Sequence, residues 1–463
     1  MANSEEFDDI IFGGGKGGKS LAMALGPAGR KVALIEQGMI GGTCINVACI
    51  PTKTMVASTR MLVESRHAGA DGFNIQVKEP NLAATLKRKH AVVDGMVKTH
   101  WNLFTHTANL EFFYGRGRFV AEKTIEVTLN DGGTKILTGK RIYINTGSRP
   151  SIPSIPGLEQ SGYLTSTTVM ELEVLPTHLA ILGGGYIALE FAQIFRRLGC
   201  EVTLIERSNR FLPREDEDIA AQLREILEEE GIKILFNSGI DSVTKDGDDT
   251  VLKIKDSSGS RDFSCSHLLV ATGRLPNTED LNLEAAGVKT DARNFIVVNE
   301  KLETSAPDIW AIGDCKGGPF FTHLSWDDFR ILRDNQLYDA KRTTNGRLCP
   351  YTLFTTPELG RVGLTEAEAR AQGLEIVVAK LPARLVPRAQ TVGQTLGLLK
   401  AIVEPKTKQI LGASILANEG GEIVSAIQVA MVAKMPYTDL GNVMFTHPTM
   451  CESLNLLFAG LPR

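Results

Sequence analysis

The chain opens with an apolar run, a glycine-rich turn and a helical run. Residues 10–12 (IIF) are apolar and predict a strand that enters the turn GGGKGG. The run LAMALGPAG at 21–29 predicts a helix, and KVALIE at 31–36 predicts a second strand. A strand, a glycine turn, a helix and a strand in this order are typical of a dinucleotide-binding fold.

Gly13, Gly15 and Gly18 in this turn have the G-x-G-x-x-G spacing, and Glu36 ends the second strand. The first glycine permits the tight turn, the second lets a pyrophosphate approach the backbone, and the third lets helix and strand pack closely. The helix N-terminus then directs unpaired N–H groups at the phosphates, and Glu36 stands where a ribose-binding acid belongs. A glycine turn can also join a strand to a helix without any ligand, so one copy alone is weak evidence.

A second copy of the pattern follows in LAILGGGYIALEFAQIFRRLGCEVTLIER. It keeps the glycine spacing and the closing acid, with Gly183, Gly185, Ala188 and Glu206. The first glycine and the closing acid both recur after 170 residues. Two copies with the same internal spacing, each between strand and helix, predict two dinucleotide-binding domains.

The last third of the chain has a different pattern. From about Leu348 it alternates short strand-like runs with one longer helical stretch, in YTLFTTP, EIVVAKLPA, LGLLKAIVEP, QILGASILA and GGEIVSAIQVAMVAKM. Strands with segregated helices predict an α+β domain of the kind often used for association. The polar segment from Asp241 to Asp262 predicts hairpins at the edge of the second dinucleotide domain. The fold class expected is α/β, with two Rossmann-like domains followed by this α+β domain.

Composition narrows the range of partners. The chain has 50 Lys and Arg against 54 Asp and Glu, a net charge of −4, which argues against a nucleic-acid or anionic-membrane binder. The start MANSEEFDD is acidic where a secretory signal is basic, and no apolar run reaches the ~18 residues of a membrane span. Seven cysteines in 463 residues are too few for a disulfide scaffold. We therefore expect a cytoplasmic protein without nucleic-acid or membrane partners.

Cys44 and Cys49 in GGTCINVACIPTK are the most informative cysteines, since they follow Glu36 by eight and thirteen residues. In a regular helix, residues five apart rise ~7.5 Å and point about 140° apart, beyond the ~7 Å that a disulfide bridges. A bond between them requires a distorted turn, and Pro51 fits such a place. A strained, accessible disulfide is the reducible, catalytic kind, and a helix N-terminus depresses a thiol pKa. The alternatives are two buried free thiols or half of a metal site, for which His447 with Cys451 is another close pair in the sequence.

The segment G-G-T-C-x-N-x-x-C-I-P-T-K resembles the redox signature of the class I flavoprotein disulfide oxidoreductases. This is the family of glutathione reductase, dihydrolipoamide dehydrogenase and mercuric reductase. Further segments match it in order along nearly the whole chain: TGSRP, GGGYIALEFA, ATGRLPN, IWAIGD and HPTMCE. The runs FFTHLSWDDFRILRD and VPRAQTVGQTLGLLKAIV are most similar to the reactive-chlorine-resistance, mercuric reductase-like branch, whose members are associated with copper(II) reduction.

The resemblance implies catalytic roles for individual residues. Cys44 would be the interchange thiol and Cys49 the thiolate packed on the flavin, while Lys53 would pair with Glu190 near the flavin. His447, oriented by Glu452, would be the acid/base for Cys44 of the partner subunit. The residues expected to bind FAD or the nicotinamide nucleotide are Gly13, Gly15, Gly18, Glu36, Thr43, Lys53, Thr146, Gly147, Gly183, Gly185, Glu206, Arg207, Gly273 and Asp314. No resident metal is expected.

The resemblance also implies a domain order and a nucleotide preference. The expected domains are an FAD-binding domain in two parts (1–150 and 273–346), an NAD(P)H-binding domain (151–272) and an interface domain (347–463) through which the chain forms a homodimer. Glu206 favours NADH because it can accept both ribose hydroxyls, whereas Arg207 can hold a 2′-phosphate. We therefore expect both NADH and NADPH to be used.

The function expected from the sequence is an FAD-dependent NAD(P)H oxidoreductase with a Cys44–Cys49 redox disulfide and a small-molecule disulfide or metal-ion acceptor, such as copper. The alternatives are a dihydrolipoamide dehydrogenase and an FAD-binding redox sensor without a dedicated substrate. Two positions depart from the family pattern, Lys16 in the first glycine turn and Ala48 before the second cysteine. The chain ends LFAGLPR, without the cysteine pair that mercuric reductases use, so mercury reduction is not expected.

Overall fold

The computed structural model describes residues 4–67, 72 and 80–461. The chain divides into two compact units, each built from separate stretches of sequence. Unit 1 contains residues 1–54, 84–152 and 273–347, and unit 2 contains residues 55–83, 153–272 and 348–463. None of the helices in the described part of the chain combines the length and apolar character that a membrane crossing requires.

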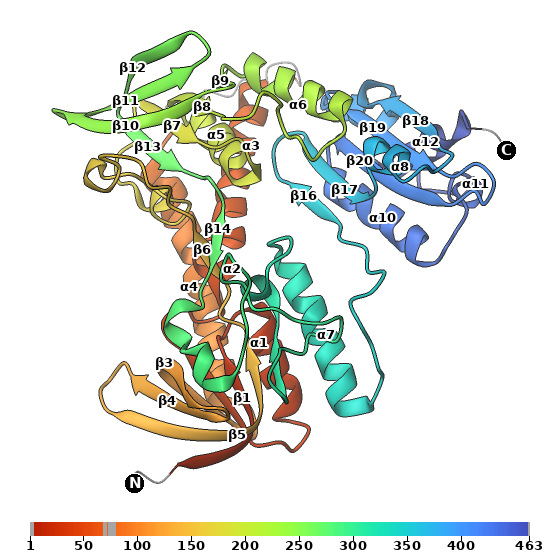
Figure 1. The fold of residues 1–463 in the computed structure, drawn as a ribbon. Coiled ribbons are helices and arrows are strands. Elements are labelled where there is room, and N and C mark those ends of the chain that lie inside the picture. The colour runs from red at the N-terminus through yellow and green to blue at the C-terminus, as the bar shows by residue number, and fades with distance from the viewer. Residues whose placement is uncertain (1–3, 68–71, 73–79, 462–463) are drawn as a thin grey trace. The chain divides into compact units, whose positions relative to one another are not determined.

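Unit 1 is built on a sheet with the order β1-β2-β3-β4-β5-β15, in which β1 also pairs with β5. Figure 1 labels β1, β3, β4 and β5 of this sheet. Its strands are β1 (Glu5–Phe12), β2 (Val32–Glu36), β3 (Leu110–Ala121), β4 (Thr124–Leu129), β5 (Thr134–Ile144) and β15 (Ile309–Ala311). The parallel pairs β1–β2, β2–β3, β1–β5 and β5–β15 form the dinucleotide-binding part, and β4 runs antiparallel to the distal ends of β3 and β5. Because β15 pairs with β5, the stretch after residue 273 completes a sheet that the N-terminal stretch began.

The helices of unit 1 place its glycine turn and its cysteines. They are α1 (Lys16–Leu25), α2 (Thr43–Asn46), α3 (Cys49–His67), which continues into unit 2, α4 (Leu82–His106) and α7 (Thr322–Tyr338). The predicted helix at 21–29 was placed too late, because α1 begins inside the glycine turn and ends at Leu25. The first strand is likewise longer than the predicted 10–12. A short antiparallel pair, β6 (Ser148–Pro150) with β14 (Arg274–Pro276), joins the two late stretches of the unit.

The nucleotide-binding part of unit 2 repeats the same construction. A parallel sheet has the order β13-β7-β8-β9 and contains β7 (His178–Leu182), β8 (Glu201–Ile205), β9 (Lys233–Leu235) and β13 (His267–Val270). Its helices are α5 (Tyr186–Leu198) and α6 (Glu217–Glu229). The predicted hairpins are confirmed as β10 (Gly239–Asp246), β11 (Asp249–Asp256) and β12 (Gly259–Cys265), which form an antiparallel sheet.

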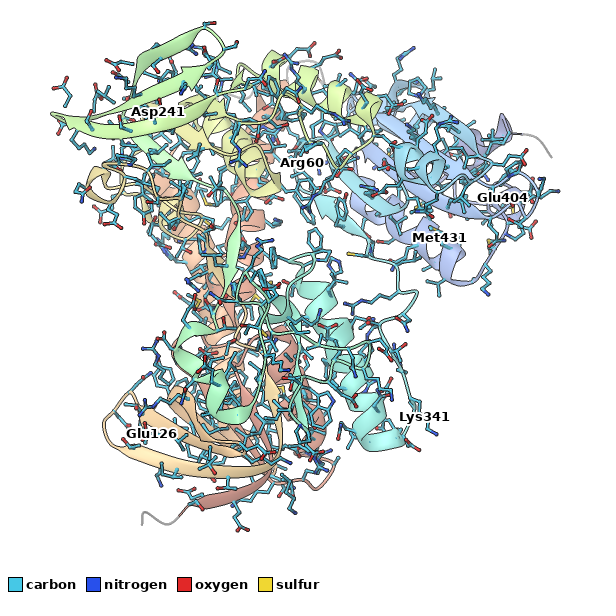
Figure 2. All side chains as sticks on the ribbon, viewed as in Figure 1. Arg60, Glu126, Asp241, Lys341, Glu404 and Met431 are labelled. Atoms are coloured by element: carbon cyan, nitrogen blue, oxygen red, sulfur yellow. The ribbon has the colours of Figure 1, made fainter. Side chains whose placement is uncertain are left out.

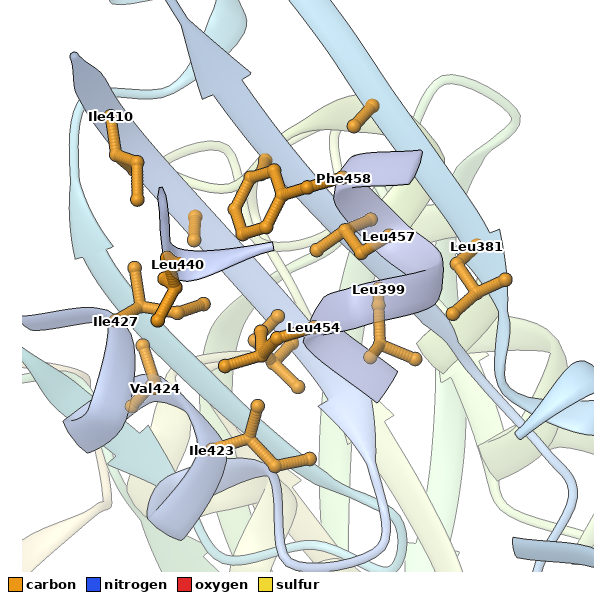
Figure 3. Packing of buried hydrophobic residues seen from close by; sticks show 14 of the residues in the cluster. Leu381, Leu399, Ile410, Ile423, Val424, Ile427, Leu440, Leu454, Leu457 and Phe458 are labelled. Carbon is orange, nitrogen blue, oxygen red and sulfur yellow. The ribbon is translucent and has the colours of Figure 1, made fainter. Parts of the chain in front are cut away.

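The C-terminal part of unit 2 confirms the predicted α+β domain. Its antiparallel sheet has the order β16-β17-β20-β19-β18, from β16 (Tyr351–Leu353), β17 (Glu358–Gly363), β18 (Val377–Pro382), β19 (Leu398–Val403) and β20 (Ile410–Ala417). The sequence pattern missed β17, whose glycines hide its strand character. The helices are α8 (Glu366–Ala371), α9 (Pro387–Thr391), α10 (Gly420–Val432), α11 (Tyr437–Leu440) and α12 (Ser453–Ala459). Leu454, Leu457 and Phe458 of α12 pack over the sheet in one buried cluster with Leu399 (Figure 3).

Polar contacts fasten the parts of unit 2 to each other. Arg60 of α3, labelled in Figure 2, donates a hydrogen bond of 2.7 Å to the Asn418 side chain just after β20. Lys400 of β19 is 3% exposed, and its Nζ lies 3.0 Å from Asp218 of α6 and 2.9 Å from Glu366 of α8. The nucleotide-binding and C-terminal parts of this unit are therefore joined by the ion pairs of a buried lysine as well as by chain connectivity.

Candidate active site: two glycine turns and a cysteine pair

The first glycine turn has a shape that only glycine permits. Gly13 has φ +91°, and a Cβ there would lie 2.3 Å from the Asn145 carbonyl oxygen. A Cβ on Gly18 would lie 2.1 Å from the Gly13 carbonyl oxygen. Gly15 is the N-cap of α1 and precedes its first turn. The backbone N–H groups that begin α1 are thus presented at a cradle with no side chain in the way, as a pyrophosphate requires.

Glu36 stands at the end of β2, where the sequence placed it. Its Oε2 accepts a hydrogen bond of 2.8 Å from the Gly14 N–H, and its Oε1 accepts from the N–H groups of Gly38 (2.8 Å) and Met39 (3.0 Å). Burial raises the pKa of Glu36, and these backbone donors oppose that rise. The carboxylate is therefore fixed in orientation beside the glycine turn, as a ribose-binding group should be.

Two further segments of unit 1 complete this cradle, namely residues 145–148 after β5 and residues 312–314 after β15. The Thr146 hydroxyl is buried and has no hydrogen-bond partner within the described residues, so it is available to a ligand. Asp314 accepts a hydrogen bond of 2.5 Å from the Ser148 hydroxyl, and burial raises the pKa of its carboxyl group. Gly147 has φ +72°, which lets the chain turn between these side chains. An orphaned hydroxyl, a half-buried carboxylate and an open glycine cradle fit the polar groups of FAD.

Asn145 is a residue of this site that sequence reasoning missed. Its Oδ1 accepts a hydrogen bond of 2.7 Å from the Gly18 N–H, and its Nδ2 donates to the Ile312 carbonyl at 2.9 Å. The Asn145 side chain, in the segment after β5, thus connects the glycine turn to the segment after β15. The available signal was its position, immediately before Thr146 in the TGSRP motif.

The second glycine turn, in unit 2, repeats the first. Gly183 has φ +113°, and a Cβ there would lie 2.6 Å from the Ala271 carbonyl oxygen, while Gly185 is the N-cap of α5. Glu206 directly follows the second strand of this copy, β8, and its Oε1 accepts a hydrogen bond of 2.7 Å from the Ser208 N–H. Arg207 beside it is exposed. Gly273, also expected at a cofactor, belongs to unit 1 and has φ +136°.

The two cysteines lie on either side of a break between helices. Cys44 is in α2, which ends at Asn46, and Cys49 is the first residue of α3. Val47 has φ −143° and ψ 15°, so the helix is interrupted there. This is the distorted turn that a bond between residues five apart requires.

Both cysteines are half-buried, and a side-chain hydrogen bond joins them to each other. That hydrogen bond, together with burial, raises the pKa of Cys44, and Thr322 and Lys19 oppose the rise. The depressed pKa expected from a helix N-terminus is therefore wrong for Cys44. Cys49 is the first residue of α3 and therefore lies at a helix N-terminus, where a thiolate is stabilised.

Thr322 is a second residue that the sequence did not single out. Its hydroxyl lies 3.3 Å from Cys49 Sγ and comes from the first residue of α7. The sequence indicated Thr322 only weakly, because this residue belonged to no motif other than the FFTHLS run that resembled one branch of the family. Over the stretches that the structure describes, no group of three or more His, Cys, Asp or Glu side chains is arranged to hold a metal ion.

The two departures from the family pattern are accommodated locally. The Lys16 ammonium lies over the Trp326 ring of α7, 5.1 Å from its centroid. Ala48 is in the turn between α2 and α3, and its carbonyl accepts a hydrogen bond of 3.0 Å from the Thr52 N–H. Thr43, which the sequence placed at the cofactor, is the first residue of α2.

The remaining expected catalytic residues are distributed over both units. Lys53 of α3 belongs to unit 1, and Glu190 of α5, which is 5% exposed, belongs to unit 2. Glu190 accepts a hydrogen bond of 3.0 Å from the Phe354 N–H inside unit 2. The pairing of Lys53 with Glu190 stays a prediction.

His447 and Glu452 are brought together near the C-terminus. His447 Nδ1 lies 2.8 Å and 2.9 Å from the two oxygens of Glu452, and the histidine side chain is 67% exposed. A carboxylate only accepts, so Nδ1 carries a proton and Nε2 is left to exchange one. Cys451 between them is half-buried, and burial raises the pKa of its thiol.

Known proteins resemble this chain over nearly its whole length. The sequence profile of the pyridine nucleotide-disulphide oxidoreductases matches residues 7–328, and that of the family's dimerisation domain matches residues 349–457. A probable pyridine nucleotide-disulfide oxidoreductase of Escherichia coli, RclA, is 39% identical over 98% of this chain and 99% of its own. A mercuric reductase of Streptomyces lividans is 38% identical over 97% of this chain and 95% of its own.

A solved structure shows the same fold. It is the Cu(II) complex of the HOCl-induced flavoprotein disulfide reductase RclA from Escherichia coli, which matches with a TM-score of 0.91 at 39% identity. The match covers 98% of this chain and 99% of that one. Both the α/β fold and the two-nucleotide, one-dimerisation-domain organisation predicted from the sequence are thereby confirmed. The chain belongs to the pyridine nucleotide-disulphide oxidoreductases, enzymes that use FAD and NAD(P)H.

Proposed function

We propose that this enzyme oxidises NADH or NADPH and passes the electrons through Cys44 and Cys49 to a small-molecule disulfide or a metal ion such as copper(II). The observation that carries the proposal is the pairing of Cys44 with Cys49 across the break between α2 and α3, with Thr322 at Cys49. The Cu(II) complex of the RclA protein supports copper as the acceptor to test first.

The residues at the glycine turns would hold the two nucleotides. Gly13, Gly15, Gly18 and Glu36 would bind the FAD pyrophosphate and ribose, with Thr43, Lys53, Thr146, Gly147, Gly273 and Asp314 along the rest of the cofactor. Gly183, Gly185, Glu206 and Arg207 would bind NADH or NADPH. FAD, when bound, supplies the chemistry that turns a hydride into electrons for the cysteine pair.

The cysteine pair carries two electrons to the acceptor. In its reduced state the Cys44–Cys49 pair holds two thiols. Cys44 would attack an acceptor disulfide, which forms a mixed disulfide and releases one acceptor thiol. Cys49 would then attack Cys44 Sγ in the mixed disulfide, which releases the second acceptor thiol and forms the Cys44–Cys49 disulfide. With copper, the same oxidation of one dithiol would reduce two Cu(II) ions to Cu(I).

Proton movement in this exchange would involve His447 and Glu452 near the C-terminus. An attacking thiol must lose its proton and a leaving thiolate must gain one. Glu452 holds His447 Nδ1, so Nε2 is free to take or give a proton. Because the dimerisation profile covers this region, His447 of the partner subunit would serve Cys44 in a homodimer.

An acceptor screen on the purified holoprotein tests the proposal. NAD(P)H oxidation would be followed with Cu(II), glutathione disulfide, lipoamide and Hg(II), and we expect the fastest turnover with Cu(II) or a disulfide. Cys44→Ser should leave Cys49 as a thiolate that gives a long-wavelength absorbance band without reductant, and Cys49→Ser should abolish that band. A band that survives Cys49→Ser would overturn the assignment, and reduction of NAD by dihydrolipoamide would favour a dihydrolipoamide dehydrogenase. Slow oxidation by oxygen alone would favour a redox sensor.

Subunit mixing tests the shared site. Neither Cys44→Ser chains nor His447→Ala chains should be active alone, but a mixed dimer keeps one site with both residues. We therefore expect partial activity to return after subunit exchange. Verified exchange with no return of activity would rule out the shared site.

A further inference from the structure

A lysine is buried in unit 1 close to the cysteine pair. Lys19 of α1 is 6% exposed, and its Nζ lies 2.6 Å from His100 Nε2 of α4 and 3.4 Å from the Gly41 carbonyl oxygen. Lysines are almost never fully buried unless paired, because the ammonium loses its hydration. Neither neighbour is a carboxylate, so the usual explanation of a buried ion pair does not apply to these contacts.

His100 is held in the form that accepts a hydrogen bond from Lys19. Its Nδ1 lies 2.7 Å from the Met96 carbonyl oxygen, which can only accept, so Nδ1 carries the ring proton. Nε2 then has the lone pair that the Lys19 ammonium needs. Burial lowers the pKa of His100, and the charges of Lys19 and Lys16 lower it further against the Met96 carbonyl. The imidazole is therefore a neutral acceptor that orients Lys19.

A pair of glycines brings this lysine to Cys44. Gly41 and Gly42 lead into α2, and a Cβ on Gly42 would lie 2.4 Å from the Gly15 Cα at the start of α1. A Cβ on Gly41 would lie 3.2 Å from the His100 Cγ. Both α1 and α4 thus pack directly against the Gly41–Gly42 loop that leads into α2, the helix of Cys44.

Lys19 and Cys44 each shift the pKa of the other. Lys19 lowers the pKa of Cys44, together with Thr322, against the hydrogen bond to Cys49 and burial. Burial and then Lys16 lower the pKa of Lys19 to about 8, and Cys44 opposes that shift. The lysine is charged at neutral pH and loses its charge as the pH rises past this value.

We propose that Lys19, held by His100, is a charge partner within the same subunit that stabilises the thiolate of Cys44 during exchange with the acceptor. This inference rests on the proposed function, in which Cys44 is the interchange thiol. When the Cys44 thiol gives its proton to His447 of the partner subunit, the negative charge left on Sγ is balanced by the Lys19 ammonium. No bond forms or breaks at Lys19, and His100 serves as its positioning residue.

The pH dependence of Cys44 alkylation tests the proposal. The FAD-loaded protein would be reduced with NADH and treated with iodoacetamide from pH 5 to 10, and labelling of each cysteine would be quantified by mass spectrometry. In Lys19→Met we expect the apparent pKa of Cys44 alkylation to rise by about one unit, which makes labelling at pH 7 roughly tenfold slower. Lys19→Gln should give the same shift, because both variants remove the charge.

Lys16→Met is the matched control. This lysine is on the same helix and its ammonium lies over Trp326, and it is not among the groups that shift Cys44. We expect its Cys44 profile to follow the wild type below about pH 8, where Lys19 carries its charge in both proteins. His100→Phe, which removes the acceptor of the Lys19 hydrogen bond together with the His100 bond to the Met96 carbonyl, should shift the profile in the same direction by less.

The outcomes separate this inference from the proposed function. Profiles of Lys19→Met and Lys19→Gln that coincide with the wild type would overturn the role of Lys19 while leaving Cys44 as the interchange thiol. If reduction with NADH does not make Cys44 reactive in the wild type, the proposed function itself fails. Loss of FAD from both Lys19 variants, with FAD retained in Lys16→Met, would show that Lys19 is structural and would also overturn the proposal.

Discussion

Replacing Glu206 by glutamine removes one negative charge from the end of β8 and changes little else. The side chain is half-buried, and its Oε1 accepts the Ser208 N–H at 2.7 Å. Its Oε2 is directed at Gly184, where a Cβ would lie 2.7 Å away. Glutamine keeps an oxygen for Ser208, so the local backbone should hold its shape while the carboxylate charge is lost.

The expected effect follows from what the carboxylate does to each nucleotide. A hydrogen bond to a charged group contributes about 1.5–3 kcal/mol, so losing the bonds to the NADH ribose should raise KM for NADH roughly 10- to 100-fold. The same charge repels a 2′-phosphate, so its removal should leave NADPH binding unchanged or improve it. The exposed Arg207 remains to hold that phosphate.

Steady-state oxidation of NADH and NADPH with a single acceptor measures this preference. The kcat/KM ratio should move toward NADPH in Glu206→Gln. Glu36→Gln is the matched control, since Glu36 has the same place in the first copy of the motif and accepts the Gly14 N–H at 2.8 Å. It should lower FAD content and leave the NADH to NADPH ratio unchanged. An unchanged ratio in Glu206→Gln would remove Glu206 from the nucleotide site.

Three further predictions concern cofactor retention and stability. Gly18→Ala should lose FAD, because the new Cβ would lie 2.1 Å from the Gly13 carbonyl oxygen, and Gly95→Ala, whose Cβ meets nothing within 4 Å, should retain it in the same absorbance assay. Lys400→Met should destabilise the protein at pH 7 by ~3–5 kcal/mol, since it leaves the buried Asp216 carboxylate, 3.3 Å from Lys400 Nζ, without its cation. The pKa of Glu366 lies below its ordinary 4.5, chiefly through its hydrogen bond from Lys400, so this stabilisation is complete above pH 4.5 and is lost as the pH falls through the lowered value. Thermal melting should therefore show a gap between variant and wild type that narrows below about pH 4.5, and an equal gap at pH 7 and 4 would contradict this reasoning. Leu454→Ala removes a fully buried side chain from the C-terminal core (Figure 3) and should cost ~2–5 kcal/mol in denaturant unfolding, whereas a cost below about 1 kcal/mol would show that the cluster does not depend on it.

The elements that the sequence predicted well are those that depend only on residues close together along the chain. The glycine turns could be placed because a tight turn before a helix needs glycine at fixed offsets, as the φ of +91° at Gly13 and +113° at Gly183 show. The hairpins between Asp241 and Asp262 and most strands of the C-terminal sheet follow from alternation over a few residues. The limits of α1 and the strand β17 were misjudged because glycines mask helix and strand propensity in both.

The sequence by itself therefore determined the two nucleotide-binding turns, the acids that end their second strands, and the presence of a cysteine pair too far apart for an unbroken helix. Only the tertiary structure decided which side chains surround those cysteines. Thr322 lies 273 positions from Cys49, Asn145 lies 127 positions from Gly18, and His100 lies 81 positions from Lys19. Contacts at such separations depend on how strands and helices pack, which no local spacing records. The pKa of Cys44 is raised by its hydrogen bond to Cys49 and by burial, and it is lowered by Thr322 and Lys19, so this balance could be found only after the chain had folded.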